Sequence, residues 1–558
     1  MARKKRLPVG IEDFKELIED NYYFVDKTGF IADFMDNRGK VTLFTRPRRF
    51  GKTLTLSMLM YFFTLKNAAE NRKLFAGLNI EKAGDEYMAE QGKRPVVFLT
   101  LKDAVARDFA GTREKFVGVL RRLYGGYGYL LTSDKVSEPE KIYFRGVLEG
   151  RLNAEQMQES FVNLMQMLAA HHGKKAVLLL DEYDAPIIYA VQHNFYDECI
   201  DFMRGLLSSA FKTNPALDFA VLTGVTRVSK ESIFSGLNHF EVHGVLSNLY
   251  TDVFGFTVAE VERLVAYYGI EDKLPDLKRW YDGYQFGETE IYNPWSIINF
   301  LKHGGELAAY WINVSQNAIL KDMLAKMDGE RREALFSLVN GGTVDMPLYE
   351  NTVFTELYEN DVNLFTMLLT AGYLKVIKKW KDDANEMWGR LKIPNEEIRI
   401  AYRREIVNNI VPRFGQPILV TMLNAMTRGD AKTFAEKLST VLRDFVSYHD
   451  TASESFYHGL LLGISVWLKG KYNIESNGES GYGRFDIAFI PQLGRELPGI
   501  VLELKIAKTE DDMEETAQKA LEQIENKQYP AKLLAQGTKV VWRYGAAFCG
   551  KKVRLTGE

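Results

Sequence analysis

A lysine and a threonine follow a glycine at the point where one apolar stretch ends and another begins. Gly51, Lys52 and Thr53 come after VTLFT at 41–45 and open the stretch KTLTLSMLMYFF at 52–63. In a phosphate-binding loop (P-loop), glycine lets the backbone approach the phosphates, lysine reaches the β and γ oxygens, and the threonine hydroxyl binds Mg²⁺. The N-terminus of the helix that starts there also favours a bound anion. These residues predict a site for a nucleoside triphosphate with its magnesium ion.

The segment departs from the common P-loop pattern at its first position. That pattern has a glycine five residues before Gly51, where this chain has Arg46. The alternative is a helix start that follows a strand and happens to contain Gly-Lys-Thr. The residues that we expect to contact the nucleotide here are Arg48, Arg49, Phe50, Gly51, Lys52, Thr53 and Leu54.

A later apolar stretch, AVLLLD at 176–181, ends in two acids. Asp181 would hold the Mg²⁺ shell through water together with Thr53, and Glu182 would polarise the attacking water. Such a strand end alone commonly marks only the exit of a strand into a loop. Its combination with Lys52 and Thr53, in this order and on these elements, is what predicts ATP hydrolysis. Binding without turnover would need the same residues except Glu182.

A further apolar stretch, FAVLTGV from Phe219, brings more polar groups to the same sheet edge. Thr223 or Thr226 could sense the γ-phosphate, and Arg227 could stabilise transferred charge. For Arg227 a surface ion pair is an equally good alternative.

A second group of acids lies near the C-terminus. Side chains alternate faces along a strand, so Glu503 and Lys505 of GIVLELKI share one face while Leu502, Leu504 and Ile506 point into a core. An antiparallel pairing with RFDIAFI at 484–490 would place Asp486 beside Glu503. Two adjacent carboxylates repel each other, and a divalent cation relieves that cost.

With Lys505, this pair could hold Mg²⁺ and hydrolyse a phosphodiester. The alternative is an exposed edge strand with alternating charges. Nearby polar residues could contact a phosphate backbone or be solvated surface groups, and these are Glu479, Arg484, Gln523, Lys527 and Tyr529.

The elements that must position these groups follow from the patterning. Apolar strands at 41–45, from Pro95, from Ala176 and from Phe219 alternate with helix-like segments, which predicts an α/β domain with a largely parallel, buried sheet over 1–250.

From 251 to 385 we expect a helical region that couples the two ends. It begins with a helix capped by Thr257 and Glu260, with Val261, Leu264, Val265 and Tyr268 on one face, and ended by Gly269. The segment WYDGYQFGETEIYNPWS at 280–296 suggests an ordered, docked loop. Strands return near the end, so 386–558 is predicted to be a helical linker followed by a second α/β domain with its core at about 450–558.

Composition bounds the rest. The 558 residues are enough for several domains, and a net charge of −3 gives no global attraction to nucleic acid. Two distant cysteines suggest neither a disulfide framework nor a zinc site, and no segment reads as a signal peptide or membrane span. We expect a cytoplasmic protein, without a membrane partner, that could assemble into homo-oligomers.

The chain resembles a family of bacterial AAA-ATPase-like proteins, which join a variant P-loop ATPase to a C-terminal PD-(D/E)XK nuclease-like domain. The ATPase markers are YFVDKTGFI at 23–31, RPRRFGKTL at 46–54, LLLDEYDAPI at 178–187, and WYDGYQFG with YNPWS at 280–296. Segments resembling the nuclease half are LKIPNEEIR at 391–399, FYHGLLLG at 456–463, ESGYGRFDIAFI at 479–490, LELK at 502–505 and ALEQIENKQY at 520–529.

The resemblance implies that Arg46 is a regular feature of the loop and that Asp486, Glu503 and Lys505 match the nuclease motif. Asp26 and Lys27 lie in a family motif and would either shape the base pocket or cap a turn. We expect an ATPase whose nucleotide state controls a Mg²⁺-dependent nuclease acting on DNA or RNA. The alternatives are a nucleotide-switched scaffold or signalling ATPase with a non-cleaving C-terminal domain, favoured by the weak net charge, and an ATP-binding core with a structural C-terminal domain.

Overall fold

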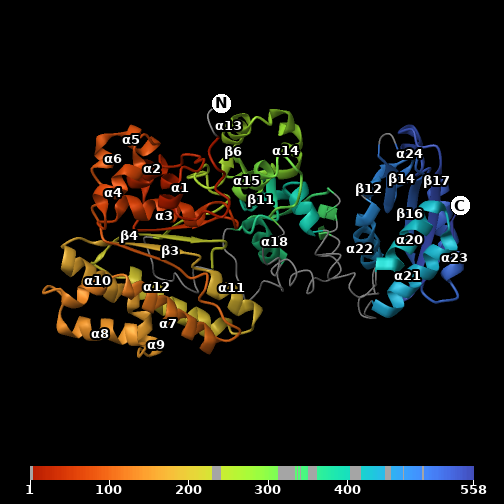
Figure 1. Cartoon of the computed structure of the whole chain (residues 1–558). Helices are drawn as coiled ribbons and strands as arrows, with labels where there is room; N and C mark the ends of the chain where they lie inside the picture. Colours follow the sequence, from red (N-terminus) through yellow and green to blue (C-terminus); the bar gives the residue numbers. More distant parts are fainter. Residues whose placement is uncertain are drawn as a thin grey trace. The chain divides into compact units, whose positions relative to one another are not determined.

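The computed structural model divides the chain into two compact units (Figure 1). It describes residues 4–228, 240–311, 334–335, 337–339, 341–349, 361–402, 416–445, 454–468, 470–492 and 495–557. Of these, the first unit holds the chain up to Trp311, the described part of Pro347–Gly389, and Pro394–Glu397. The second holds the described residues of 334–346, Arg390–Ile393 and the chain from Ile398 onward. The predicted domain boundaries stay predictions.

A five-stranded parallel sheet forms the centre of the first unit. Its order is β2-β3-β4-β1-β5, so β4 lies between the strand before Lys52 and the strand that ends in Asp181. Every residue of β1 and β3 is buried, as expected for a sheet covered on both faces. The parallel α/β domain is confirmed. The strands are β1 Val41–Thr45, β2 Val96–Thr100, β3 Ala176–Asp181, β4 Leu217–Gly224 and β5 Phe240–His243.

Helices cover both faces of this sheet. Figure 1 shows α2–α6 above the strands and α7–α10 with α12 below them. The elements are α1 Phe14–Glu19, α2 Phe30–Asn37, α3 Lys52–Phe63, α4 Ala68–Arg72, η1 Lys73–Phe75, α5 Asn79–Ala83, α6 Asp85–Met88, α7 Phe109–Gly125, η2 Gly128–Thr132, α8 Glu138–Glu149, α9 Ala154–Gln158, α10 Ser160–His172, α11 Ala185–Gln192 and α12 Tyr196–Phe211.

The middle of the chain is mainly helical and also holds short strands. Its first helix has the predicted capping box of Thr257 and Glu260 and ends at Gly269, and its apolar face packs in a core with Tyr281 and Phe300. The elements are β6 Phe256–Thr257, α13 Val258–Tyr268, η3 Glu271–Lys273, α14 Leu274–Tyr281, β7 Tyr284–Phe286, β8 Thr289–Tyr292, α15 Pro294–Lys302, β9 Val344–Pro347, α18 Asp361–Thr370, β10 Lys375–Lys381 and β11 Met387–Lys392.

The aromatic segment at 280–296 is regular structure, so the prediction of a loop was wrong. Strands β7 and β8 pair as an antiparallel hairpin, and α15 follows directly with Asn293 as its N-cap. The glycines that suggested a loop occupy the turns: Gly287 has φ 54° in the hairpin and Gly283 has φ 105° before it.

A mixed five-stranded sheet forms the core of the second unit, in the order β12-β15-β16-β17-β18. Strands β16 and β17 are parallel, with α23 between them in the chain, and the other pairs are antiparallel. Residues of α23 and Tyr529 pack on the sheet. The elements are α20 Gln416–Arg428, α21 Ala431–Phe445, α22 Glu454–Ser465, η7 Val466–Leu468, β12 Tyr472–Ser476, β13 Glu479–Ser480, β14 Gly483–Arg484, β15 Ile487–Pro491, β16 Gly499–Ile506, α23 Met513–Asn526, α24 Ala531–Ala535, β17 Val541–Cys549 and β18 Lys552–Gly557.

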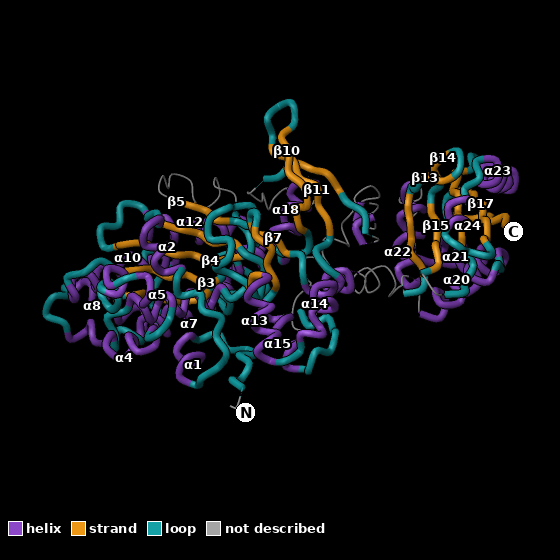
Figure 2. Tube along the Cα trace, turned by 90° about the horizontal axis from the view of Figure 1, so that it is seen from above, coloured by secondary structure: helices purple, strands orange, loops and turns teal. Residues whose placement is uncertain are grey.

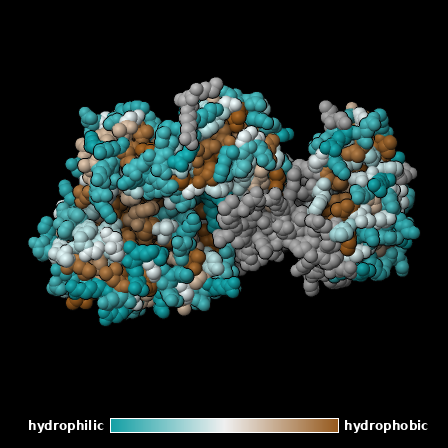
Figure 3. Space-filling view, viewed as in Figure 1, coloured by the Kyte–Doolittle hydropathy of each residue, from teal (hydrophilic) through white to brown (hydrophobic). Residues whose placement is uncertain are grey.

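The surface is mixed. On the face in Figure 3, hydrophilic residues cover most of the described surface and hydrophobic ones form separate patches. Within the described residues, no helix combines the length and apolar character that a membrane crossing would require.

Candidate functional site

The loop from β1 into α3 has the backbone that a phosphate site needs. Gly51 caps α3 with φ 86°, a left-handed conformation that glycine adopts without steric cost. A Cβ at Gly51 would meet no other atom within 4 Å, so the side of the loop that it faces is open. The helix begins at Lys52, and its free N–H groups form the anion-binding end.

Lys52 lies folded back on this loop. Its side chain is buried, and Nζ donates to the carbonyl oxygens of Arg46 at 2.9 Å and Pro47 at 2.8 Å. Burial lowers the pKa of Lys52, and the charges of Glu182 and Asp181 act in the opposite direction. The structure therefore brings the predicted lysine and the two predicted acids into one electrostatic neighbourhood.

Asp181 links three elements of the sheet edge. Thr53 Oγ1 donates to Asp181 Oδ2 at 2.6 Å, and Thr223 Oγ1 at the end of β4 donates to Asp181 Oδ1. The Thr53 hydroxyl and the Asp181 carboxylate, which we predicted as magnesium ligands, thus lie at hydrogen-bond distance, and both supply the oxygen atoms that Mg²⁺ prefers. The residues present fit the ion.

Glu182 lies just beyond β3 with φ 50°, uncommon for a residue other than glycine. Burial raises the pKa of its carboxyl, which Lys52 counteracts. The sequence interpretation overlooked the third acid of the motif, Asp184, which is buried and whose Oδ2 accepts from Val225 N, Thr226 N and Thr226 Oγ1. The Thr226 hydroxyl is therefore used to join two loops.

Arg46 acts as a cross-link at the position where a common P-loop has glycine. Its fully buried guanidinium donates to Thr45 O at 2.9 Å, His243 O at 2.7 Å and Tyr250 O at 3.2 Å. It also lies over the rings of two phenylalanines, Phe254 and Phe286. Burial lowers its pKa to about 9. Arg46 thus ties the start of the loop to β5 and to the segment after it.

The tip of the loop is held by the middle of the chain. Phe50 packs against Tyr284 and Phe286 of the β7–β8 hairpin, with ring centroids 5.0 and 5.2 Å apart. Arg49 has φ 68°, and its Nη1 donates to Trp311 O at 2.8 Å. The carbonyl of Arg48 accepts from Trp311 Nε1 at 3.4 Å and Asn293 Nδ2 at 3.5 Å. The aromatic segment at 280–296 therefore packs on the predicted phosphate loop.

Two further predicted residues take different places. Asp26 Oδ1 accepts from Thr28 N and Oγ1, and Oδ2 accepts from Asn79 N, so it caps a turn. Lys27 pairs with Glu260 at 2.6 Å. The base-pocket alternative gains no support from these contacts. Arg227 is half-buried beyond β4, and its charge acts on the Tyr183 phenol. Leu54 lies half-buried in the first turn of α3.

The second predicted site forms where β15 meets β16. The strands pair antiparallel with Ile487 opposite Leu502. Asp486 lies one residue before β15, and its Oδ2 accepts from Leu504 N at 2.7 Å. Glu503 Oε1 accepts from Lys505 Nζ at 3.0 Å and from Gln523 Nε2 at 2.5 Å. Asp486, Glu503 and Lys505 are thus brought together, and Gln523 joins them from α23.

The carboxylate of Glu503 is buried in surroundings that disfavour its ionised form. Its side chain is 2% exposed, and burial, followed by the charge of Asp486, raises its pKa to about 7. Its Oε2 has no hydrogen-bond partner among the described residues. Burial lowers the pKa of Lys505, but the bond and charge of Glu503 outweigh this and leave it raised. A buried, unpartnered carboxylate oxygen beside a second acid fits a divalent cation.

Two neighbours from α22 were missing from the predicted site. The charge of Glu454 couples to Asp486, Lys505 and His458. Burial raises the pKa of Glu454, and Asp486 raises it further. His458 Nε2 lies 3.1 Å from Asp486 O and 3.2 Å from Ser476 Oγ. The signal for His458 was the family segment FYHGLLLG at 456–463, and Glu454 lies two residues before that segment.

One expectation for this region is wrong, and the other nearby polar residues take different places. Ile506 is 40% exposed at the end of β16, so it does not reach the core. Arg484 Nε donates to Asn477 O, and Lys527 is exposed on the surface. Tyr529 is buried, and its hydroxyl accepts from Gln523 Nε2 at 3.1 Å. Gln523 therefore contacts the acidic site, whereas Lys527 lies on the surface.

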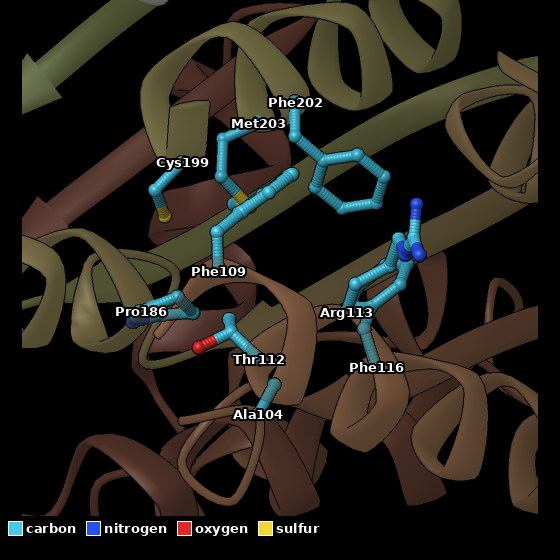
Figure 4. A pocket seen from close by; sticks show the side chains of 9 residues that line it. All are labelled: Ala104, Phe109, Thr112, Arg113, Phe116, Pro186, Cys199, Phe202 and Met203. Atoms are coloured by element: carbon cyan, nitrogen blue, oxygen red, sulfur yellow. The ribbon is translucent and has the colours of Figure 1, made fainter. Parts of the chain in front are cut away.

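A separate apolar cavity of about 10 Å³ lies among α7, α11 and α12 (Figure 4). It has room for about one water molecule. Its lining includes none of the predicted site residues and consists of Ala104, Phe109, Thr112, Arg113, Phe116, Pro186, Cys199, Phe202 and Met203.

Comparison with known proteins finds family-model matches to two parts of the chain. Residues 8–234 match the model of a family described as a predicted AAA-ATPase, and residues 452–558 match that of the PD-(D/E)XK nuclease superfamily. An uncharacterized protein in the vnfD 5′ region of Azotobacter chroococcum mcd 1 is 28% identical over 419 residues, which cover 74% of this chain and 72% of that protein. The resemblance found in the sequence, an ATPase-like domain joined to a nuclease-superfamily domain, is confirmed.

Proposed function

We propose that this protein binds and hydrolyses ATP at the P-loop and that its nucleotide state controls divalent-cation-dependent cleavage of DNA or RNA by its C-terminal domain. The observation that carries the proposal is the convergence of Lys52, Thr53, Asp181 and Glu182 at one sheet edge. Lys52 and Thr53 lie at the start of α3, which follows β1, and the two acids lie at the end of β3. Strands β1 and β3 are not neighbours in the sheet, because β4 lies between them.

In the ATPase reaction, Lys52 would exchange its two loop carbonyls for β- and γ-phosphate oxygens. Magnesium held by Thr53 and Asp181 would neutralise charge on those phosphates and polarise them. Thr223 keeps the Asp181 carboxylate oriented. Glu182, whose pKa is raised by burial, would accept the hydrogen bond of the attacking water.

In the nuclease reaction, Asp486 and Glu503 would hold a divalent cation that polarises the scissile phosphate. Lys505 would stabilise charge on the phosphate oxygens and orient the attacking water. Gln523 would fix the Glu503 carboxylate, leaving Oε2 for the cation.

The second candidate is a nucleotide-switched scaffold whose C-terminal domain binds without cleaving. One observation favours it: the net charge of −3 gives no global attraction to nucleic acid. Such a domain would retain affinity for nucleic acid or protein while lacking turnover.

One experiment separates these functions. Purified protein is incubated with linear, nicked and single-stranded DNA and with RNA, with and without Mg²⁺ and ATP, and products are resolved on a gel. Cleavage that requires Mg²⁺ and changes with ATP supports the proposal. Binding by mobility shift without cleavage supports the scaffold, and cleavage indifferent to ATP would refute the proposed control.

A further inference from the structure

Glu397 is a buried carboxylate at the P-loop that neither proposed reaction uses. Its side chain is fully buried, and it accepts hydrogen bonds from Ser296 Oγ and from Trp311 N, both at 2.7 Å. It belongs to the segment LKIPNEEIR, which we had assigned to the nuclease half. The structure places Pro394–Glu397 in the first unit instead.

Through these two hydrogen bonds Glu397 is linked to both residues that contact the Arg49 guanidinium, Trp311 and Trp295. Trp311 accepts from Arg49 Nη1 through its carbonyl and donates to Glu397 through its N–H. Trp295, whose ring lies 4.7 Å from the Arg49 guanidinium, directly precedes Ser296 in the first turn of α15. The charge of Glu397 also acts on Arg49, although burial dominates in lowering the pKa of this guanidinium.

The electrostatic situation makes this carboxylate a poor choice for structure alone. A buried anion costs several kcal/mol unless it is paired with a cation. Arg49 is the cation whose charge acts on it. The free energy of the ionised Glu397 carboxylate therefore depends on the position of Arg49.

Arg49 is also placed to change partners. It lies two residues before Gly51 with a left-handed backbone, and its present acceptor is a neutral carbonyl. A triphosphate is a stronger acceptor for a guanidinium because such hydrogen bonds are charge-assisted. Movement of Arg49 toward phosphate would leave Trp311 O without this donor and weaken the field that stabilises ionised Glu397.

We propose that Glu397 is a positioning residue for the P-loop, which holds Arg49 through Trp311 and the start of α15 and responds when nucleotide draws Arg49 away. The inference rests on the proposed ATP site. It adds a route for the proposed control, because the chain from Ile398 onward belongs to the second unit.

The test uses the full-length protein and Mg²⁺-ATP. Affinity is measured by calorimetry for the wild type, Glu397→Ala, Glu397→Gln, Arg49→Ala and the double variant Arg49→Ala with Glu397→Ala. The control is Glu306→Gln, the same chemical change at an exposed position near this region. Circular dichroism establishes that each variant is folded, and if Glu397→Ala unfolds, the comparison with wild type rests on Glu397→Gln.

We expect Glu397→Ala to weaken ATP binding about tenfold, Glu397→Gln to weaken it less, and Glu306→Gln to leave it unchanged. The double variant should bind no more weakly than Arg49→Ala, because Glu397 acts through Arg49. Losses that add in the double variant, or an unchanged affinity of both Glu397 variants, would overturn the inference. A wild type that does not bind ATP refutes the proposed function itself, so the two failures are distinct.

Tryptophan fluorescence supplies a readout that a purely structural role would not move. ATP should change the wild-type emission, and Trp311→Phe, which keeps the backbone contacts of residue 311, should remove most of that change. If Glu397→Gln binds ATP but keeps the full wild-type fluorescence change, Glu397 does not respond to the nucleotide.

Discussion

Thr53 Oγ1 donates a 2.6 Å hydrogen bond to Asp181 Oδ2 across 128 residues of sequence. The strands that lead to them, β1 and β3, are not neighbours, because β4 lies between them and adds Thr223 to the same carboxylate. The predicted ligands of one magnesium ion are therefore assembled by strand order.

Replacing Lys52 with alanine should abolish tight ATP binding. The ammonium would make charge-assisted contacts to the phosphates, and we expect at least about a hundredfold loss of affinity. Calorimetry measures this, with Lys66→Ala as a control because Lys66 is an exposed lysine past the end of α3. An unchanged affinity would refute the P-loop assignment.

Glu182→Gln should separate binding from hydrolysis. The amide keeps the shape of the side chain but cannot accept a proton, so ATP affinity should persist while kcat falls by about 10²–10⁴. Phosphate release measures the rate. A variant that hydrolyses ATP at the wild-type rate would remove Glu182 from the mechanism.

Lys505→Ala should eliminate divalent-dependent cleavage and leave ATPase activity intact. Lys505 Nζ contacts Glu503 in the C-terminal sheet, whereas the ATPase residues belong to the other unit. Nuclease and ATPase assays on one preparation check both halves of the prediction, with exposed Lys539→Ala as control. Persistence of cleavage would mean that the active site lies elsewhere.

Arg46→Gly would restore the common P-loop pattern, yet we expect it to destabilise the protein. The change leaves carbonyls of Thr45, His243 and Tyr250 without this donor and opens a cavity beside Phe254 and Phe286. The loss should be about 3 kcal/mol or more, measured by urea unfolding. A more stable variant would show that the cross-link is dispensable.

Glu397 should make stability fall as pH rises. Burial raises its folded-state pKa from 4.5 to about 7 against the opposing hydrogen bonds of Trp311 and Ser296, so the folded state retains the proton over that interval. Stability from this group is full below about pH 4.5 and declines by about 3 kcal/mol through pH 7.

Thermal melts of the wild type and Glu397→Gln between pH 5 and 8 check this. Glutamine does not titrate, so the melting temperature of the wild type should fall more steeply with rising pH than that of the variant. Parallel curves would contradict a raised pKa at this site.

Much of the site was predictable from sequence because it depends on local patterns. An apolar strand followed by Gly51, Lys52 and Thr53 specifies a strand–loop–helix through short-range preferences, and AVLLLD specifies a buried strand ending in acids. The capping box at Thr257 likewise follows from neighbouring residues. The resemblance of whole segments added the nuclease assignment for Asp486, Glu503 and Lys505.

Tertiary structure alone decided which distant groups meet. Glu397 lies in a segment that the sequence assigned to the nuclease half, but it pairs with Trp311 and Ser296, because a buried carboxylate must find donors wherever the fold supplies them. Gln523 reaches Glu503 while Lys527, four residues later, stays exposed. Helix spacing fixes which residues share a side of a helix, whereas packing against the sheet fixes which of them becomes part of the site.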